Sequence, residues 1–269
     1  MKPLQKFGIA IWAMLLSGCV SNIVDGMNTW DGWLGGKEKE AKAEQSARID
    51  EVPMYGGMDR SKYPELKKAD EEFIAGVTKA FGSREAGAMR LVDQGFAFYK
   101  EDKLGMAMRR FNQAWLLNPQ NADVFTGFAN VLNDQGKYCE ANEMMEKSFT
   151  LVPPIAMNPP EAYFALQGTY PDASLVMTRC AISNKVLTPA EKKQWFDRAE
   201  RLFEKQDRLL PAKDGFRKAY LYETWAKAYY LQEQYEKAWA MVKKQRDLGR
   251  EPMKKFLDIL REKMPEPAH

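Results

Sequence analysis

"NPQNADVFTGFANVLNDQGKYCEANEMMEKSFTLVPP" (residues 118–154) repeats the pattern of the stretch that precedes it, "LVDQGFAFYKEDKLGMAMRRFNQAWLLNP" (residues 91–119). A 34-residue spacing with small residues at fixed positions and a closing proline is typical of helix–turn–helix repeats. Small side chains let two helices approach, and proline ends the second helix because it lacks an N–H. The matched pairs are Leu91 with Phe125, Gly95 with Ala129, Phe98 with Leu132, Leu104 with Tyr138, Ala107 with Ala141, Phe111 with Met145, Ala114 with Ser148 and Pro119 with Pro153.

At these positions the sequence resembles the tetratricopeptide repeat family, from which it departs at Gln94, where the family prefers leucine. The resemblance implies antiparallel helix pairs stacked into an all-α solenoid. We place the repeats at 88–121 and 122–155, with helices over about 85–100, 104–117, 122–134 and 138–150. Ser83 is the expected N-cap of the first of these helices.

Two further repeats are expected towards the C-terminus. Residues 219–252 match residues 122–155 at a constant offset of 97. A degenerate repeat spans 174–212, where Ala199, Phe203 and Pro211 keep the spacing of the earlier repeats, and its second helix begins with a capping box of Thr188 and Glu191. Its first helix is expected in "SLVMTRCAIS" (174–183). About 24 extra residues precede Ala199, so the proline-rich segment 153–187 contains an insertion, and insertions of this kind often carry function.

Single helices are expected at both ends of the repeat domain, which we bound at 84–269. Residues 61–83 predict a helix that packs on the first repeat, and residues 252–264 predict a capping helix that covers the last apolar face. The inward residues would be Leu66, Phe73, Ile74, Val77 and Phe81 in the first helix, and Phe256, Ile259 and Leu260 in the second. The tryptophans of the repeats, Trp115, Trp195, Trp225 and Trp239, are expected to fill space between helices.

The N-terminus predicts export and lipid attachment. "MKPLQKFGIAIWAMLLSGC" has a basic start and an apolar run too short to span a bilayer, which fits a signal peptide over residues 1–18. "LSGC" resembles the lipobox of bacterial lipoproteins, which implies that Cys19 becomes the acylated first residue. Val20 follows in place of aspartate, and by that resemblance we expect an outer-membrane lipoprotein facing the periplasm, ahead of an inner-membrane or surface-exposed one. The alternative is an ordinary signal peptide with a chance cysteine.

Residues 19–60 have the composition of a tether, with glycines, a charged run and few core residues. Trp30 and Trp33 are unusual there. They could dock on the folded domain, lie at the lipid interface or bind a partner.

Composition and motifs argue against several classes of function. The chain of 269 residues has a formal charge of +3, which gives no reason to expect a nucleic-acid partner. Its one histidine is the last residue, His269, and no Gly-rich phosphate loop, GxSxG elbow or CxxC pair occurs. We therefore expect no enzyme activity, no cofactor and no metal.

Export changes the meaning of the remaining cysteines. Cys139 and Cys180 would enter an oxidising compartment, where a disulfide between them is expected. The alternative is two separate buried thiols.

The resemblance also implies where a partner would bind. In this family the first helix of each repeat lines the inner groove, and a carboxylate clamp is doubtful here because Val92 and Phe96 occupy its positions. Either these side chains form a binding surface or they are solvated faces and contacts between helices. The corresponding residues are Phe96, Tyr99, Lys100, Asp123, Thr126, Asn130, Asn133, Asp134, Tyr220, Glu223, Lys227 and Tyr230.

Together these observations predict a lipid-anchored scaffold that binds another envelope protein or peptide. The expected role is an adaptor for cell-envelope machinery, such as peptidoglycan enzymes or secretin and pilus assembly. The alternative is an accessory or immunity lipoprotein of a secretion system that binds a toxic effector. An envelope enzyme ranks third.

Overall fold

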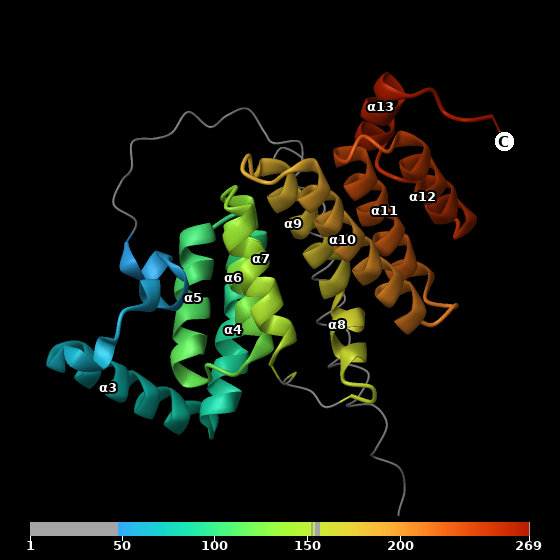
Figure 1. Ribbon diagram of the computed structural model, residues 1–269. Helices are drawn as coiled ribbons and strands as arrows, with labels where there is room; N and C mark the ends of the chain where they lie inside the picture. The colour runs from blue at the N-terminus through green and yellow to red at the C-terminus, as the bar shows by residue number, and fades with distance from the viewer. Residues whose placement is uncertain (1–47, 152, 154–156, 269) are drawn as a thin grey trace, which may run out of the picture. The chain divides into compact units, whose positions relative to one another are not determined.

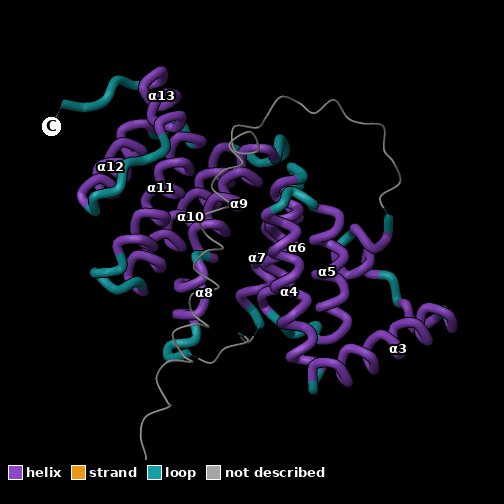
Figure 2. Tube along the Cα trace, turned by 180° about the vertical axis from the view of Figure 1, so that it is seen from behind, coloured by secondary structure: helices purple, strands orange, loops and turns teal. Residues whose placement is uncertain are grey.

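The computed structural model describes residues 48–151, 153 and 157–268, and every regular element in that part of the chain is a helix (Figure 2). The predicted all-α class is confirmed. The chain divides into two compact units, residues 1–117 and 118–269. The signal peptide, Cys19, Trp30 and Trp33 lie outside the described residues.

The first unit is built around one helical hairpin. Helix α4 (Arg84–Lys100) packs against α5 (Leu104–Leu117), and the two helices match the predicted bounds to within one residue (Figure 1). The Ser83 hydroxyl oxygen caps α4 by accepting a hydrogen bond from the Ala86 N–H at 3.0 Å. A Cβ atom at Gly95 would lie 2.5 Å from the Phe111 ring. The small residue therefore permits the close approach that the repeat pattern predicted.

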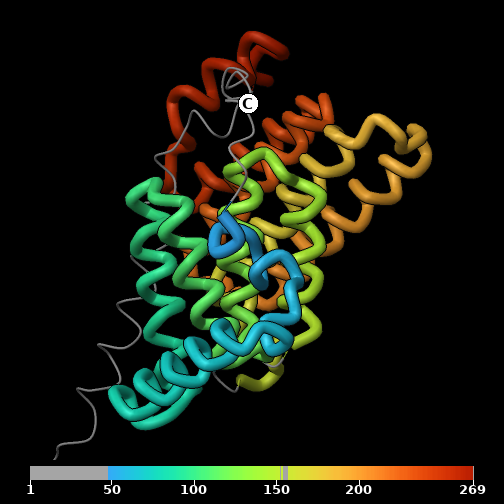
Figure 3. Tube along the Cα trace, turned by 90° about the vertical axis from the view of Figure 1, so that its left-hand side faces the viewer, coloured from blue at the N-terminus to red at the C-terminus, as the bar shows by residue number. Residues whose placement is uncertain are grey.

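Short 3₁₀ turns precede this hairpin. The first two lie against α5, and the third lies against the helix that follows it, residues 64–81 (Figure 3). They are η2 (Ile49–Glu51), η3 (Pro53–Gly57) and η4 (Arg60–Lys62). The fully buried Asn112 side chain of α5 donates to the carbonyls of Asp50 and Val52 at 2.9 and 2.8 Å. Residues 49–60, which we assigned to the tether, are thus part of the folded unit. The sequence did not indicate this attachment because it depends on side chains far along the chain: Asn112, and Arg109, which forms ion pairs with Asp50 and Glu51.

Helix α3 (Pro64–Phe81) joins the turns to the hairpin. Its predicted apolar face is only half-buried, and Phe81 at its end is 45% exposed, so the expectation that Phe81 points inward was wrong. Val77 lies close enough to α4 that a Cβ atom at Gly87 would meet it at 2.3 Å. The helix therefore contacts α4 near its C-terminal end, one turn before Phe81.

The second unit contains three helical hairpins and a terminal helix (Figure 1). In the packed pairs, α6 lies against α7, α9 against α10 and α11 against α12, while α9 also contacts α7 and α11. The elements are α6 (Ala122–Asp134), α7 (Tyr138–Phe149), α8 (Glu161–Gln167), α9 (Thr169–Ser183), α10 (Pro189–Leu209), α11 (Gly215–Leu231), α12 (Tyr235–Asp247) and α13 (Lys254–Lys263).

The predicted small and large repeat positions form the interior of these hairpins. Phe111, Met145 and Phe203, at one matching position of three repeats, are at most 1% exposed, and the Phe203 ring stacks on Trp225 at 5.1 Å. The capping box of Thr188 and Glu191 starts α10 as predicted. Small residues with no exposed surface are Ala107, Ala129, Ala141, Ala199, Ala226 and Ala238.

The C-terminal end of the unit is closed by α13. Phe256, Leu257 and Leu260 are buried, whereas Ile259 is only half-buried. The helix thus faces inward with Leu257 in the place we expected for Ile259. Trp225 and Trp239 are buried as predicted, and the Trp239 indole N–H donates to the Met264 carbonyl at 3.2 Å.

Candidate functional site

The predicted groove residues of α4 lie on a half-buried surface of the first unit. Phe96, Tyr99 and Lys100 are each partly covered. The Phe96 ring meets Phe111 edge to face at 5.1 Å, so at least this side chain contributes to packing between α4 and α5.

The predicted residues of α6 are bonded to neighbouring helices of the second unit. The Tyr163 hydroxyl of α8 donates to Asp123 at 2.6 Å, and the Arg179 guanidinium of α9 donates to Asn133 at 2.8 Å. The Thr126 hydroxyl lies 3.1 Å from the Ser148 hydroxyl on α7. These side chains therefore hold helices together as well as lying at groove positions. The two others of the set are half-buried Asn130 and exposed Asp134.

The predicted residues of α11 are more deeply covered. Glu223 and Lys227 form an ion pair at 2.7 Å, with side chains only 6% and 11% exposed. The Gln245 amide of α12 donates to the other Glu223 oxygen at 3.3 Å. The Tyr230 ring meets Phe256 of α13 edge to face at 6.1 Å. Glu223 and Lys227 are thus interior, whereas Tyr220 and Tyr230 are half-buried.

Asp172 of α9 lies at the centre of this polar region, and the sequence did not single it out. It accepts a hydrogen bond from the Tyr220 hydroxyl of α11. Burial raises the pKa of Asp172 to about 6, although the Tyr220 hydrogen bond and the charges of Lys227 and Arg179 act to lower it. Burial also raises the pKa of Tyr220 well above its ordinary value.

These contacts define a network that we call the first-helix network: Asn133 and Asp134 of α6, Asp172 and Arg179 of α9, and Tyr220, Glu223 and Lys227 of α11. Five of its seven members are residues that the repeat resemblance marked as groove positions. Because its groups are paired with one another, the network links α6, α9 and α11 with specific geometry. As a partner surface, these residues stay a prediction.

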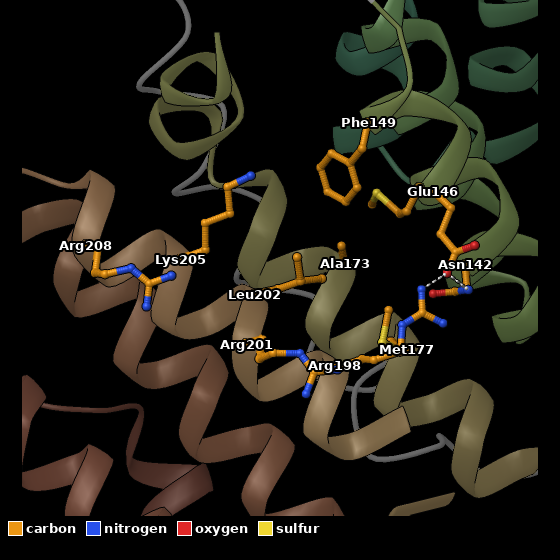
Figure 4. Close-up of a pocket in the computed structure, with 11 residues that line it drawn as sticks. Asn142, Glu146, Phe149, Ala173, Met177, Arg198, Arg201, Leu202, Lys205 and Arg208 are labelled. Carbon is orange, nitrogen blue, oxygen red and sulfur yellow. Dashed lines mark hydrogen bonds and ion pairs between the residues drawn. The ribbon is translucent and has the colours of Figure 1, made fainter. Parts of the chain in front are cut away.

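A hollow lies elsewhere in the second unit, where α7, α9 and α10 meet (Figure 4). Its volume is about 360 Å³. We call it the second-helix groove, because α7 and α10 are the second helices of their pairs. Its apolar part is formed by Met145, Phe149, Ala173, Met177 and Leu202, and its polar part by Asn142, Glu146, Arg198, Arg201, Lys205 and Arg208.

Four cations of α10 line one wall of this groove. Arg198, Arg201, Lys205 and Arg208 follow each other at steps of three and four residues, which places them on one face of the helix (Figure 4). On the opposite wall, Glu146 of α7 pairs with Arg198 at 2.8 Å. The groove thus combines an apolar floor with an excess of positive charge.

A disulfide holds two of the groove helices together. The sulfur atoms of Cys139 and Cys180 lie 2.07 Å apart, and they join the N-terminal turn of α7 to the C-terminal part of α9. The predicted pairing is confirmed. The bond connects two regular helices, and the second of them, α9, begins at Thr169, five residues before the expected start at Ser174.

Other kinds of site are not found in the described part of the chain. It contains no cluster of His, Cys, Asp or Glu that could hold a metal ion. Nor does any of its helices combine the length and apolar character required to cross a membrane. Comparison with models of known families, with curated proteins and with solved structures found no match.

Proposed function

We propose that this chain is a lipid-anchored, periplasm-facing scaffold of tetratricopeptide-type hairpins that binds another envelope protein. The observation that carries the proposal is the second-helix groove, a hollow of about 360 Å³ with an apolar floor and a charged wall. Pockets that combine apolar surface with a few placed polar groups are the usual form of a binding site.

Two further features support this reading. The helices pair as the 34-residue spacing requires, and the repeat positions are buried in the way that the resemblance implies. The Cys139–Cys180 bond suits an oxidising compartment, where disulfides persist. We propose that Cys19, after cleavage of residues 1–18, carries the acyl chains that hold the protein at the outer membrane.

Site-specific crosslinking in living cells tests the binding role. A photo-reactive amino acid would replace Lys205, which lines the groove, or Lys243, which is exposed on α12 and serves as the matched control. We expect a discrete adduct with an envelope protein from position 205 only. An adduct with envelope-assembly machinery supports the adaptor role, and one with a toxic effector supports the immunity role. Equal adducts at both positions, or none, would contradict the proposal.

Metabolic labelling with an alkyne-tagged fatty acid tests the anchor. The wild-type chain should take up the label and sediment with membranes, and Cys19→Ala should lose both properties. Membrane association that persists without label would count against lipid attachment.

A further inference from the structure

The cations that line the second-helix groove differ in how closely each is paired with a carboxylate. Arg198 is held by Glu146 at 2.8 Å. Lys205 and Arg208 have only long ion pairs, with Glu161 and Glu204, each at 3.9 Å, and the Lys205 ammonium also lies 4.9 Å from the centre of the Tyr170 ring. No ion pair joins Arg201 to any carboxylate among the described residues.

Pairs this long between exposed side chains contribute little to stability. A carboxylate brought by a partner could replace them at low cost. Three cations of the wall, Arg201, Lys205 and Arg208, are therefore available for an acidic ligand. They extend along two turns of α10, or about 10 Å at a rise of about 1.5 Å per residue.

The floor of the groove calls for apolar groups in the same ligand. Half-buried Phe149 of α7 and Leu202 of α10 form its accessible part, and the nearly buried Met177 of α9 lies between these two helices (Figure 4). A purely charged ligand would leave this surface wet.

One buried atom points to a hydrogen-bond donor in the ligand. Asn142 is 3% exposed, and its Nδ2 donates to Glu146 at 3.2 Å. Its Oδ1 is buried and accepts no hydrogen bond within the described residues. A buried acceptor without a partner is destabilising, and an N–H of a peptide seated in the groove would satisfy it.

From these observations we infer that the second-helix groove binds an acidic amphipathic segment of another protein, with its apolar side chains on Phe149 and Leu202 and its carboxylates on Arg201, Lys205 and Arg208. The inference rests on the proposed protein-binding function and names the chemistry of the partner. Because the wall of the groove is positively charged, charge complementarity requires a ligand with negative charge.

The shape of the groove favours a protein segment over an anionic membrane. Its apolar groups form the floor and its cations form a wall, whereas a bilayer would need apolar groups that project beyond the charges. Glu146 on the opposite wall would also repel lipid phosphates. A peptide can enter the hollow and avoid this carboxylate.

The experiment uses the full chain in phosphatidylcholine nanodiscs and a fluorescent peptide built only of leucine, alanine and glutamate, with leucines at helical spacing. We expect saturable binding that weakens at least about tenfold in Arg201→Glu/Arg208→Glu. The matched control, Lys185→Glu/Lys243→Glu, makes the same change in net charge at exposed positions outside the groove. It should bind the peptide as the wild type does.

A charge-inverted peptide, with lysine in place of glutamate, makes the test reciprocal. It should bind Arg201→Glu/Arg208→Glu more tightly than it binds the wild type. Circular dichroism of each variant checks that the fold is kept.

Three outcomes would overturn the inference. They are failure of the acidic peptide to bind, equal loss of binding in both charge variants, and a groove-dependent affinity for phosphatidylglycerol vesicles that the peptide does not compete away. If position 205 crosslinks a partner while the acidic peptide fails, the assigned chemistry is wrong and the scaffold role stands. If no partner crosslinks at all, the proposed function itself fails.

Discussion

The first-helix network and the second-helix groove are both rich in charge, but they use it differently. In the network, Glu223 and Lys227 are almost covered and bond to each other and to Gln245. In the groove, Arg201 has no ion-pair partner among the described residues and Arg208 has only a distant one. Charges that are paired and buried fix the arrangement of helices, whereas charges left open beside apolar surface suit recognition. Side chains at sequence-predicted binding positions can thus be structural, while binding is assigned to a surface that no motif marked.

The largest expected effect is the loss of the core that positions both features. Phe203→Ala would leave a cavity on the inner side of α10, against Trp225. We expect the free energy of unfolding to fall by about 3–5 kcal/mol, as is usual for a fully buried phenylalanine. Urea denaturation followed by circular dichroism measures this. A loss below about 1 kcal/mol would mean that α10 is not packed as described.

Removal of the disulfide should loosen the packing of α7 on α9 at the groove more than it affects the first-helix network. Cys139→Ser/Cys180→Ser frees α7 from α9, and a bond that closes a loop of about 40 residues contributes roughly 2–4 kcal/mol. We expect this loss in denaturant unfolding, and the double variant should no longer respond to reductant. A wild-type chain whose melting temperature is the same with and without reductant would contradict the bond.

Breaking the buried ion pair of Glu223 and Lys227 should lower the free energy of unfolding and leave the structure of the groove unchanged. Lys227→Met leaves the Glu223 carboxylate buried beside only Gln245, and we expect a loss of about 3 kcal/mol. The double variant Glu223→Leu/Lys227→Met removes both charges and should recover most of that loss. If the single and double variants unfold alike, the pair does not stabilise the network through its charges.

Titration of Asp172 in the first-helix network should make the free energy of unfolding depend on pH, which is a smaller effect. Its folded pKa of about 6 exceeds the ordinary value of 3.8, so the folded state holds the proton more tightly than the unfolded state. This group therefore favours folding at acid pH, and its contribution falls between about pH 4 and pH 6, by at most about 3 kcal/mol. Tyr220, Lys227, Arg179 and Asp134 are the groups that act on it.

Asp172→Asn keeps the shape of the side chain and removes the titration. We expect denaturant midpoints of this variant to vary less over that window, with a gain in stability at pH 7. A wild-type profile with the opposite slope in the window, unchanged by the substitution, would rule out the raised pKa.

The sequence predicted the regular hairpins well because their signals are local and repeated. Helices α4, α5, α6 and α7 begin and end within one residue of their expected bounds. In this region the 34-residue repeat and the spacing of apolar residues at about 3.6 per helical turn predict the same helices. The same agreement explains why Gly95 and the repeat alanines could be assigned to helix contacts in advance.

The segment with the insertion was harder to predict. We expected the helix of this proline-rich segment to begin at Ser174, yet α9 starts at Thr169, and Pro171 lies in its first turn, where proline is tolerated. The seven-residue helix α8 is too short for a periodic signal. The second-helix groove depends on the way α7 and α10 flank α9, and such a tertiary arrangement cannot be read from Arg201 or Arg208, which look like a solvated face.

The most direct test compares two variants in two assays: unfolding by urea and binding of the acidic peptide. We expect each variant to fail in one assay only. Lys227→Met should lose about 3 kcal/mol of stability and keep its affinity for the peptide. Arg201→Glu/Arg208→Glu should keep its stability and lose affinity at least about tenfold. If the first variant loses peptide binding while still folded, or the second binds like the wild type, the division between a structural network and a binding groove is wrong.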